Sequence, residues 1–356
     1  MSWIKRAALV VLAVVSMSTG AVAADVTIRV GMVRAVSTGA LLIAVERGYF
    51  KELGLNVVVE EADSSANVLA LLSQNRFQVV MRGISAGYFN AVEKGLPIVI
   101  AMSRVSTPIR HNLLLRADLA DRVKEVKQLK GRTIATNGPG SVSTYEIGKI
   151  LETAGLTLAD VDLRVIPFGQ YGIAFANKAI DAALAIAPWS VQLPKQGLAV
   201  PFADSDELIR PSPVSISVAS INTDWAKASP DLARAFFLGY QRGARDYCQA
   251  YHGGSPRKAI IDLLVRSGYE TRPELLDEYV WPSADPLGRV NIVSMLDMQA
   301  WFVKHKYAGT PVGAERLVDA SYADDAAQSS GRSCWRTRQA RSPAAGRWWH
   351  ASHARV

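Results

Sequence analysis

The stretch from Val26 to Glu60, VTIRVGMVRAVSTGALLIAVERGYFKELGLNVVVE, contains one complete strand–helix–strand unit. Its opening residues, through Val33, alternate in the manner of a strand, and a second strand begins at Asn56. Between the two strands, Ser37 and Thr38 offer an N-cap for an apolar helix that a glycine ends. Strands separated by such helices are typical of a mostly parallel sheet with right-handed crossovers.

The same alternation continues on both sides of the hundredth residue. Two more strands are expected at 77–81 and 97–102, with helices opened by Ser64 or Ser65 and by Ser85. A second series then begins. It comprises strands at 131–136, 162–167 and 181–186, a tight loop at 137–140, and helices at 141–154 and 171–178. The sequence therefore predicts an α/β protein with two lobes.

Two extended segments connect these lobes. Asn112 to Arg116 leads out of the first lobe, and Val214 to Ile221 leads back. Two crossing strands predict a hinge and a cleft rather than one fused core. After Thr223 the pattern is helical throughout, and we expect a helical layer that packs back on the first lobe.

Composition excludes several classes of protein. The chain has 356 residues, 49% of them apolar and 20% charged, so it can bury a sizeable core. Its net charge of +8 resides at the ends, because residues 25–326 hold 32 basic and 32 acidic side chains. A neutral body disfavours a dedicated nucleic-acid binder, which needs basic residues on its folded surface.

The two ends of the chain differ from the body. Residues 1–24 combine a basic start, an apolar run and the small residues Ala21-Val22-Ala23, which predicts a signal peptide cleaved near Ala23 or Ala24. The apolar run is too short for a membrane anchor. Residues 327–356 hold three Trp and six Arg but no Asp, Glu, Leu or Ile, so we expect a disordered basic tail. A basic arm for membranes or nucleic acid is the alternative for this tail.

Catalytic and metal-binding motifs are absent from the sequence. It has no H-E-x-x-H, no G-x-S-x-G and no G-x-x-x-x-G-K-[ST] motif, and only two cysteines. Within the body, His111, His252 and His305 lack the spacing of metal ligands. We therefore expect no catalytic residue, no metal and no cofactor.

Polar and small residues follow several of the predicted strands. The loop from Asn137 to Thr144 lies between a strand and a helix, where free N–H groups favour an anion. A dinucleotide loop is the alternative there, but Ser143 replaces the third glycine and no acid ends the next strand. Ligands of parallel sheets lie at the carboxyl ends of strands, so these loops are expected to face one another. The predicted ligand-binding residues are Arg34, Ser37, Thr38, Ser85, Asn137, Gly140, Ser141, Ser143, Thr144 and Trp189.

Each of these residues also has a purely structural interpretation. The serines and threonines are equally suited to cap helices, and Trp189 to pack in the core. Arg34 and Arg82, beside the loops, are candidates to hold a sulfonate or a carboxylate, the alternative being solvated surface residues. Stacking on Trp189 would instead favour a neutral aromatic ligand. Only the joint placement of these residues favours a binding site.

Several runs of sequence resemble a known family. They are ALLIAVERGYFKELGLNV at 40–57, ALLSQNRFQVV at 70–80, VKQLKGRTIA at 126–135, GPGS at 138–141, LETAGLTLADV at 151–161 and AIDAALAIAPW at 179–189. Over residues 28–325 the chain resembles the NMT1/THI5-like, or NitT/TauT-type, substrate-binding proteins of ABC importers. Gln78 departs from the pattern, because the family often has Asp at this position.

The resemblance implies a type II periplasmic-binding-protein fold with a ligand cleft between the lobes. Lobe 1 would span 25–110 and 218–326, and lobe 2 would span 111–217. The implied function is capture of a small anion, such as a sulfonate, taurine or nitrate, or of a small aromatic compound. The implied partner is a membrane permease, and we expect a periplasmic monomer without nucleic acid. The alternative is an enzyme similar to thiamine-pyrimidine-precursor synthases, or another periplasmic enzyme on the same fold, although the cysteine-rich iron motif of the synthase branch is absent.

Overall fold

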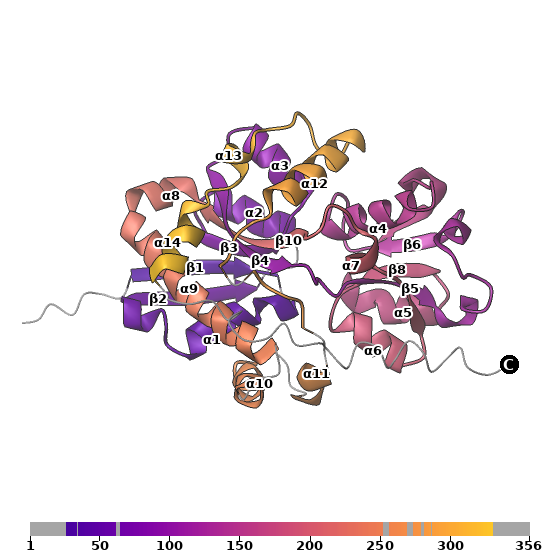
Figure 1. Ribbon diagram of the computed structural model, residues 1–356, viewed down its shortest axis with the longest axis horizontal. Helices are drawn as coiled ribbons and strands as arrows, with labels where there is room; N and C mark the ends of the chain where they lie inside the picture. The colour runs from indigo at the N-terminus through magenta and orange to yellow at the C-terminus, as the bar shows by residue number, and fades with distance from the viewer. Residues whose placement is uncertain are drawn as a thin grey trace, which may run out of the picture.

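A computed structural model describes residues 26–33, 35–61, 65–251, 256–268, 273–278, 281–285 and 287–329. The predicted signal peptide, Arg34 and residues 330–356 of the predicted tail lie outside these ranges, whereas residues 327–329, also predicted as tail, end a helix. Within them the chain forms two lobes that lie side by side, each a five-stranded sheet with helices on both faces (Figure 1). The type II two-lobe α/β architecture that the sequence predicted is therefore confirmed.

The first lobe is built on the sheet β2-β1-β3-β10-β4. Its strands are β1 (Val26–Met32), β2 (Leu55–Glu61), β3 (Val79–Gly83), β4 (Ile98–Ser106) and β10 (Ser215–Asn222). Its helices near the start of the chain are α1 (Gly39–Glu46), α2 (Ser65–Ser73) and α3 (Ala86–Glu93). β1 pairs in parallel with β2, as the opening stretch of sequence predicted, and also with β3.

The second lobe is built on the sheet β7-β6-β8-β5-β9. Its strands are β5 (Asn112–Arg116), β6 (Thr133–Thr136), β7 (Asp162–Val165), β8 (Ala182–Ala185) and β9 (Ala199–Asp204). Its helices are α4 (Val142–Glu152), α5 (Tyr171–Ala176), α6 (Trp189–Lys195) and α7 (Ser205–Leu208). Gly155 ends the α4 region in the left-handed conformation, with φ of 72°.

One strand in each sheet runs against its neighbours. β10 pairs antiparallel with β3 and β4, and β5 pairs antiparallel with β8 and β9. These are the two segments that the sequence predicted as the hinge, and that interpretation is wrong because both are internal strands. The chain crosses instead in the residues just before them, at 107–111 and 209–214. Because the chain enters each sheet from the neighbouring lobe, the entering strand runs away from the cleft, opposite to the others.

The remaining helices follow β10. They are α8 (Thr223–Ala228), α9 (Pro230–Tyr251), α10 (Arg257–Arg266), α11 (Pro273–Glu278), α12 (Ile292–Lys304), α13 (Ala314–Leu317) and α14 (Ser321–Ser329). α9 packs on α1 so closely that a Cβ on Gly243 would lie 2.3 Å from the carbonyl oxygen of Ala40. Within the described ranges, no helix combines the length and apolar composition needed to cross a bilayer.

Helix α12 touches both lobes. In the first lobe its Phe302 packs on Phe89 of α3, with ring centroids 6.0 Å apart. On the second lobe its Trp301 makes an edge contact with Tyr145 of α4, with centroids 5.5 Å apart, and a Cβ on Gly148 would lie 2.0 Å from the indole. The lobes therefore meet through side-chain packing as well as through the two crossing segments.

Candidate functional site

A cavity of about 120 Å³ lies between the lobes. Residues that end or follow β1, β3, β6 and β8 line it, together with residues of the crossing segment at 107–111 and of β10. Its polar lining residues are Ser37, Arg82, Ser85, Arg104, Arg110, His111, Asn137, Ser141, Ser143 and Ser217. No Asp or Glu is among the described residues that line it, so its charged side chains are cationic.

The loop before α4 forms one wall of the cavity. Ser141 caps the helix, its Oγ accepting a hydrogen bond from the N–H of Thr144 at 3.3 Å. Thr144 is fully buried and donates from Oγ1 to the carbonyl of Gly138 at 2.8 Å. The carbonyl of Gly140 accepts from the N–H of Ala86 at 2.8 Å, which joins the loop to the first lobe. The loop is therefore held rigidly in place beside the cavity.

Arg82 presents a buried positive charge to the cavity. Its side chain is 1% exposed, and burial lowers the pKa of the guanidinium to about 10. Its Nη1 donates to the carbonyl of Gly83 at 3.0 Å and its Nη2 donates to Oγ of Ser220 at 3.2 Å, while Nε has no partner. Among the described residues, no carboxylate forms an ion pair with it. The alternative of a solvated surface arginine is therefore wrong.

Arg104, on β4, adds a second buried guanidinium group. It is 3% exposed and donates from Nη1 to Oγ of Ser217 at 3.1 Å and from Nη2 to Oγ of Ser37 at 3.3 Å. Both serines also line the cavity. Two buried cations that donate mainly to hydroxyl and carbonyl oxygens form a wall suited to a negatively charged group.

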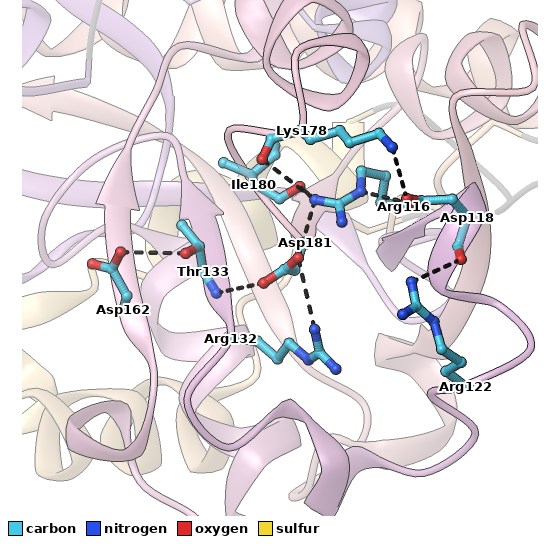
Figure 2. Close-up of polar contacts among 9 residues, drawn as sticks. All are labelled: Arg116, Asp118, Arg122, Arg132, Thr133, Asp162, Lys178, Ile180 and Asp181. Atoms are coloured by element: carbon cyan, nitrogen blue, oxygen red, sulfur yellow. Dashed lines mark hydrogen bonds and ion pairs between the residues drawn. The ribbon is translucent and has the colours of Figure 1, made fainter.

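Unlike Arg82 and Arg104, which lie in the first lobe, an arginine of the second lobe is paired with carboxylates (Figure 2). Arg116 on β5 donates from Nε to Oδ1 of Asp118 at 2.6 Å, and its Nη1 lies 3.0 Å from Oδ1 of Asp181. Its charge is therefore balanced by two carboxylates, that of Asp118 at the surface and that of Asp181 partly buried. Arg82 has no such carboxylate partner in the part of the chain that the structure describes.

The structure brings half of the predicted site residues to the cavity. They are Ser37, Ser85, Asn137, Ser141 and Ser143. Four others are not among the residues that line the cavity. Thr38 is fully buried and donates to the carbonyl of Ala35, and Gly140 packs on Ala86. Thr144 holds the loop together. Trp189 begins α6 and stacks on Phe168, with centroids 5.1 Å apart.

Residues that the sequence did not single out as ligand contacts complete the lining. Arg104 lies near the end of β4, while Arg110 and His111 lie on the crossing segment. Phe168 follows β7 and presents its ring where Trp189 was expected, and Ser217 lies on β10. The carboxyl-end rule could have identified Arg104 and Phe168, but the other three are brought to the cavity only by the packing of the lobes.

A metal site is not supported within the described ranges, where no three His, Cys, Asp or Glu side chains come together. Apolar residues from both lobes and from the crossing segment also line the cavity. They include Ile84, Ile109, Val142, Phe168, Ile186 and Ala187. The cavity therefore combines cationic and hydroxyl groups with an aromatic ring and aliphatic side chains, which suits an anion that carries an apolar part.

Comparisons with known proteins agree with this description. Residues 36–250 match the family model described as NMT1/THI5 like. No curated protein matches the chain.

Solved structures share the fold at low sequence identity. The alkanesulfonate-binding protein SsuA from Xanthomonas axonopodis pv. citri, bound to MOPS, is 16% identical with a TM-score of 0.67, covering 83% of this chain and 98% of its own. The periplasmic nitrate-binding protein NrtA from Synechocystis PCC 6803 is 15% identical with a TM-score of 0.70, covering 85% and 88%. The desulfurization enzyme DSZB is 13% identical with a TM-score of 0.61, covering 85% and 100%. The fold thus serves both binding proteins and an enzyme.

Proposed function

The chain belongs to the NMT1/THI5 like family, and on this premise we propose that it is the extracytoplasmic solute-binding protein of an ABC importer. It captures a small organic anion between its two lobes and delivers it to a membrane permease. A signal peptide at residues 1–24 exports it to the periplasm. It binds its ligand without converting it.

The uncompensated charge of Arg82 is the observation that carries this proposal. A buried cation without a counterion is costly, and the cost falls when an anion reaches it. The neighbouring Arg104 and the hydroxyls of Ser37 and Ser217 supply further donors for an anionic group. A bound sulfonate or carboxylate would therefore receive the charge-assisted hydrogen bonds that the protein leaves open.

The apolar residues that line the cavity narrow the ligand class. Phe168 lines the cavity, and Trp189 stacks behind it, which fixes the orientation of the Phe168 ring. A ring on the ligand can stack against Phe168 while its charged group reaches the arginines. We therefore expect an aromatic sulfonate or carboxylate to bind more tightly than nitrate, taurine or methanesulfonate.

A thermal-shift series with one matched neutral compound tests the proposal. We expect benzenesulfonate and benzoate to raise the melting temperature, and benzenesulfonamide, the uncharged analogue, to leave it unchanged. At a concentration 100 times its Kd a ligand adds about 2.7 kcal/mol of stability, which corresponds to a shift of a few degrees. Calorimetry should give one site, and chromatography should return the ligand unaltered.

Two results would contradict this function. Equal stabilisation by benzenesulfonamide would show that negative charge is irrelevant to binding. Release of a product from benzenesulfonate would instead indicate an enzyme. This outcome is tested because the desulfurization enzyme DSZB shares the fold.

A further inference from the structure

A buried chain of polar side chains ends at the cavity. His111 lies on the crossing segment between β4 and β5, and its ring lines the cavity. Its Nδ1 lies 2.9 Å from Oε1 of Glu146 on α4. The other carboxylate oxygen, Oε2, accepts from Oγ of Ser205 at 2.8 Å, and both Glu146 and Ser205 are completely buried. The cavity function described above uses none of these three residues.

This arrangement fixes the orientation of the imidazole ring. As an ionised carboxylate, Glu146 only accepts hydrogen bonds, so Nδ1 of His111 carries its proton. Within the described residues, Nε2 makes no hydrogen bond. The neutral ring would offer Nε2 as an acceptor, whereas the imidazolium would offer an N–H donor there. His111 can therefore donate a hydrogen bond from Nε2 to an anion only when it is the imidazolium.

The surrounding charges decide which form is favoured. Arg82, Arg104 and Arg110 line the same cavity and disfavour a further positive charge on His111 while the cavity is empty. Glu146, which contacts Nδ1, favours a positive charge on His111. On the neighbouring segments Asp206 accepts from the backbone N–H groups of Ile109 and Arg110, and Asp204 accepts from the N–H of Asp206. A bound anion adds a negative charge on the cavity side and shifts the balance toward imidazolium.

We propose that His111, oriented by Glu146 and Ser205, is a proton-linked ligand contact, so that an anion binds together with one proton. This inference rests on the function proposed above and adds a dependence of affinity on pH. Because imidazole changes its charge between pH 5 and 8, affinity for an anion rises as the pH falls through this range. The protein would hold anions more tightly in an acidic medium.

Calorimetry with benzenesulfonate tests the proposal. The sulfonate keeps its charge from pH 5.5 to pH 8, so any pH dependence belongs to the protein. We expect the affinity to be about tenfold higher at pH 5.5 than at pH 8, the gain that one added charge-assisted hydrogen bond from Nε2 would give. Titrations in buffers of different ionisation enthalpy should show uptake of up to one proton for each ligand bound near pH 7.5.

Three variants separate a ligand contact from a merely structural residue. His111→Gln should abolish the proton uptake and bind at pH 5.5 no better than the parent protein does at pH 8. Glu146→Gln keeps an acceptor for Nδ1 but removes the charge, so the pH dependence should move to lower pH. His305→Gln is the matched control, because His305 also lies beside a glutamate, with Nε2 3.4 Å from Oε1 of Glu152, but outside the cavity. This control should retain the full uptake.

The possible failures are distinguishable. Tight benzenesulfonate binding with no proton uptake and equal affinity at both pH values would overturn the role of His111 and leave the proposed function standing. Unchanged uptake in His111→Gln would do the same. Absence of binding by benzenesulfonate and benzoate at every pH would overturn both proposals.

Discussion

Replacing Arg82 by methionine should weaken the binding of benzenesulfonate by about 10- to 150-fold while the empty protein stays folded. A hydrogen bond to a charged group contributes about 1.5–3 kcal/mol, and each 1.4 kcal/mol is a factor of ten in Kd. The unliganded protein should tolerate the change, because a buried charge without an ionic partner is replaced by an apolar side chain of similar volume. Arg104→Met should show the same loss of affinity, measured independently by calorimetry.

The matched control is Arg116→Met. Arg116 is also an arginine on a strand, but it is paired with Asp118 and Asp181 (Figure 2). Its removal takes one ion-pair partner from each of two carboxylates, which keep Lys178 and Arg132 nearby, so we expect a modestly lower unfolding free energy with no change in affinity. If Arg82→Met and Arg104→Met instead unfold the protein or bind benzenesulfonate normally, the two arginines stabilise the lobe and do not bind the ligand.

The second large effect is expected at Gly148, where the two lobes touch. A Cβ at this position would lie 2.0 Å from the Trp301 indole, so Gly148→Ala forces α4 and α12 apart. Overpacking of this kind costs about 1–3 kcal/mol, of which the higher helix propensity of alanine offsets about 1 kcal/mol. We expect a lower melting temperature and a weaker affinity for benzenesulfonate, because closure of the lobes over the ligand becomes less favourable.

Two comparisons isolate the steric cause. Gly172→Ala on α5 makes the same chemical change where the nearest side-chain atom, on Leu193, is 3.5 Å from the added Cβ, and it should be neutral or slightly stabilising. Trp301→Leu combined with Gly148→Ala should recover part of the lost stability. An affinity of Gly148→Ala equal to that of the parent protein would mean that contact between α4 and α12 plays no part in binding.

The sequence predicted the local elements well where pattern and caps agree. The helix expected at 141–154 is α4, which Ser141 caps, and Asn291 caps α12 through its side chain. The unit from Val26 to Glu60 was recognisable because its strand and helix periods differ clearly. β9 was not anticipated, since Pro201 interrupts its pattern. Its place at the edge of the sheet is where a strand tolerates proline.

Strand direction was the part of the fold that the sequence could not supply. β5 and β10 have ordinary strand patterns, and alternation is the same for parallel and antiparallel pairing. Only the path of the chain between the lobes shows that they run against their neighbours. The strand patterns of β5 and β10 alone therefore predicted a hinge at these two segments.

The candidate site, too, could be predicted from the sequence only in part. Ser37, Ser85 and Ser141 follow strands, so the rule that ligands lie at strand ends placed them at the cavity. Trp189 follows a strand too, but its indole stacks on Phe168, a contact that depends on packing between segments distant in sequence. His111 carries no local motif, and its pairing with Glu146 exists only in the folded lobe.

A crystal structure with 4-bromobenzenesulfonate bound is the most direct test that an anion is held between the lobes. The bromine gives an anomalous signal that locates the ring, and the map locates the sulfonate. We predict a single strong peak in the cavity, with the ring facing Phe168 and the sulfonate oxygens within hydrogen-bond distance of Arg82 or Arg104. A peak outside the cavity, or a sulfonate turned away from both arginines, would contradict the account.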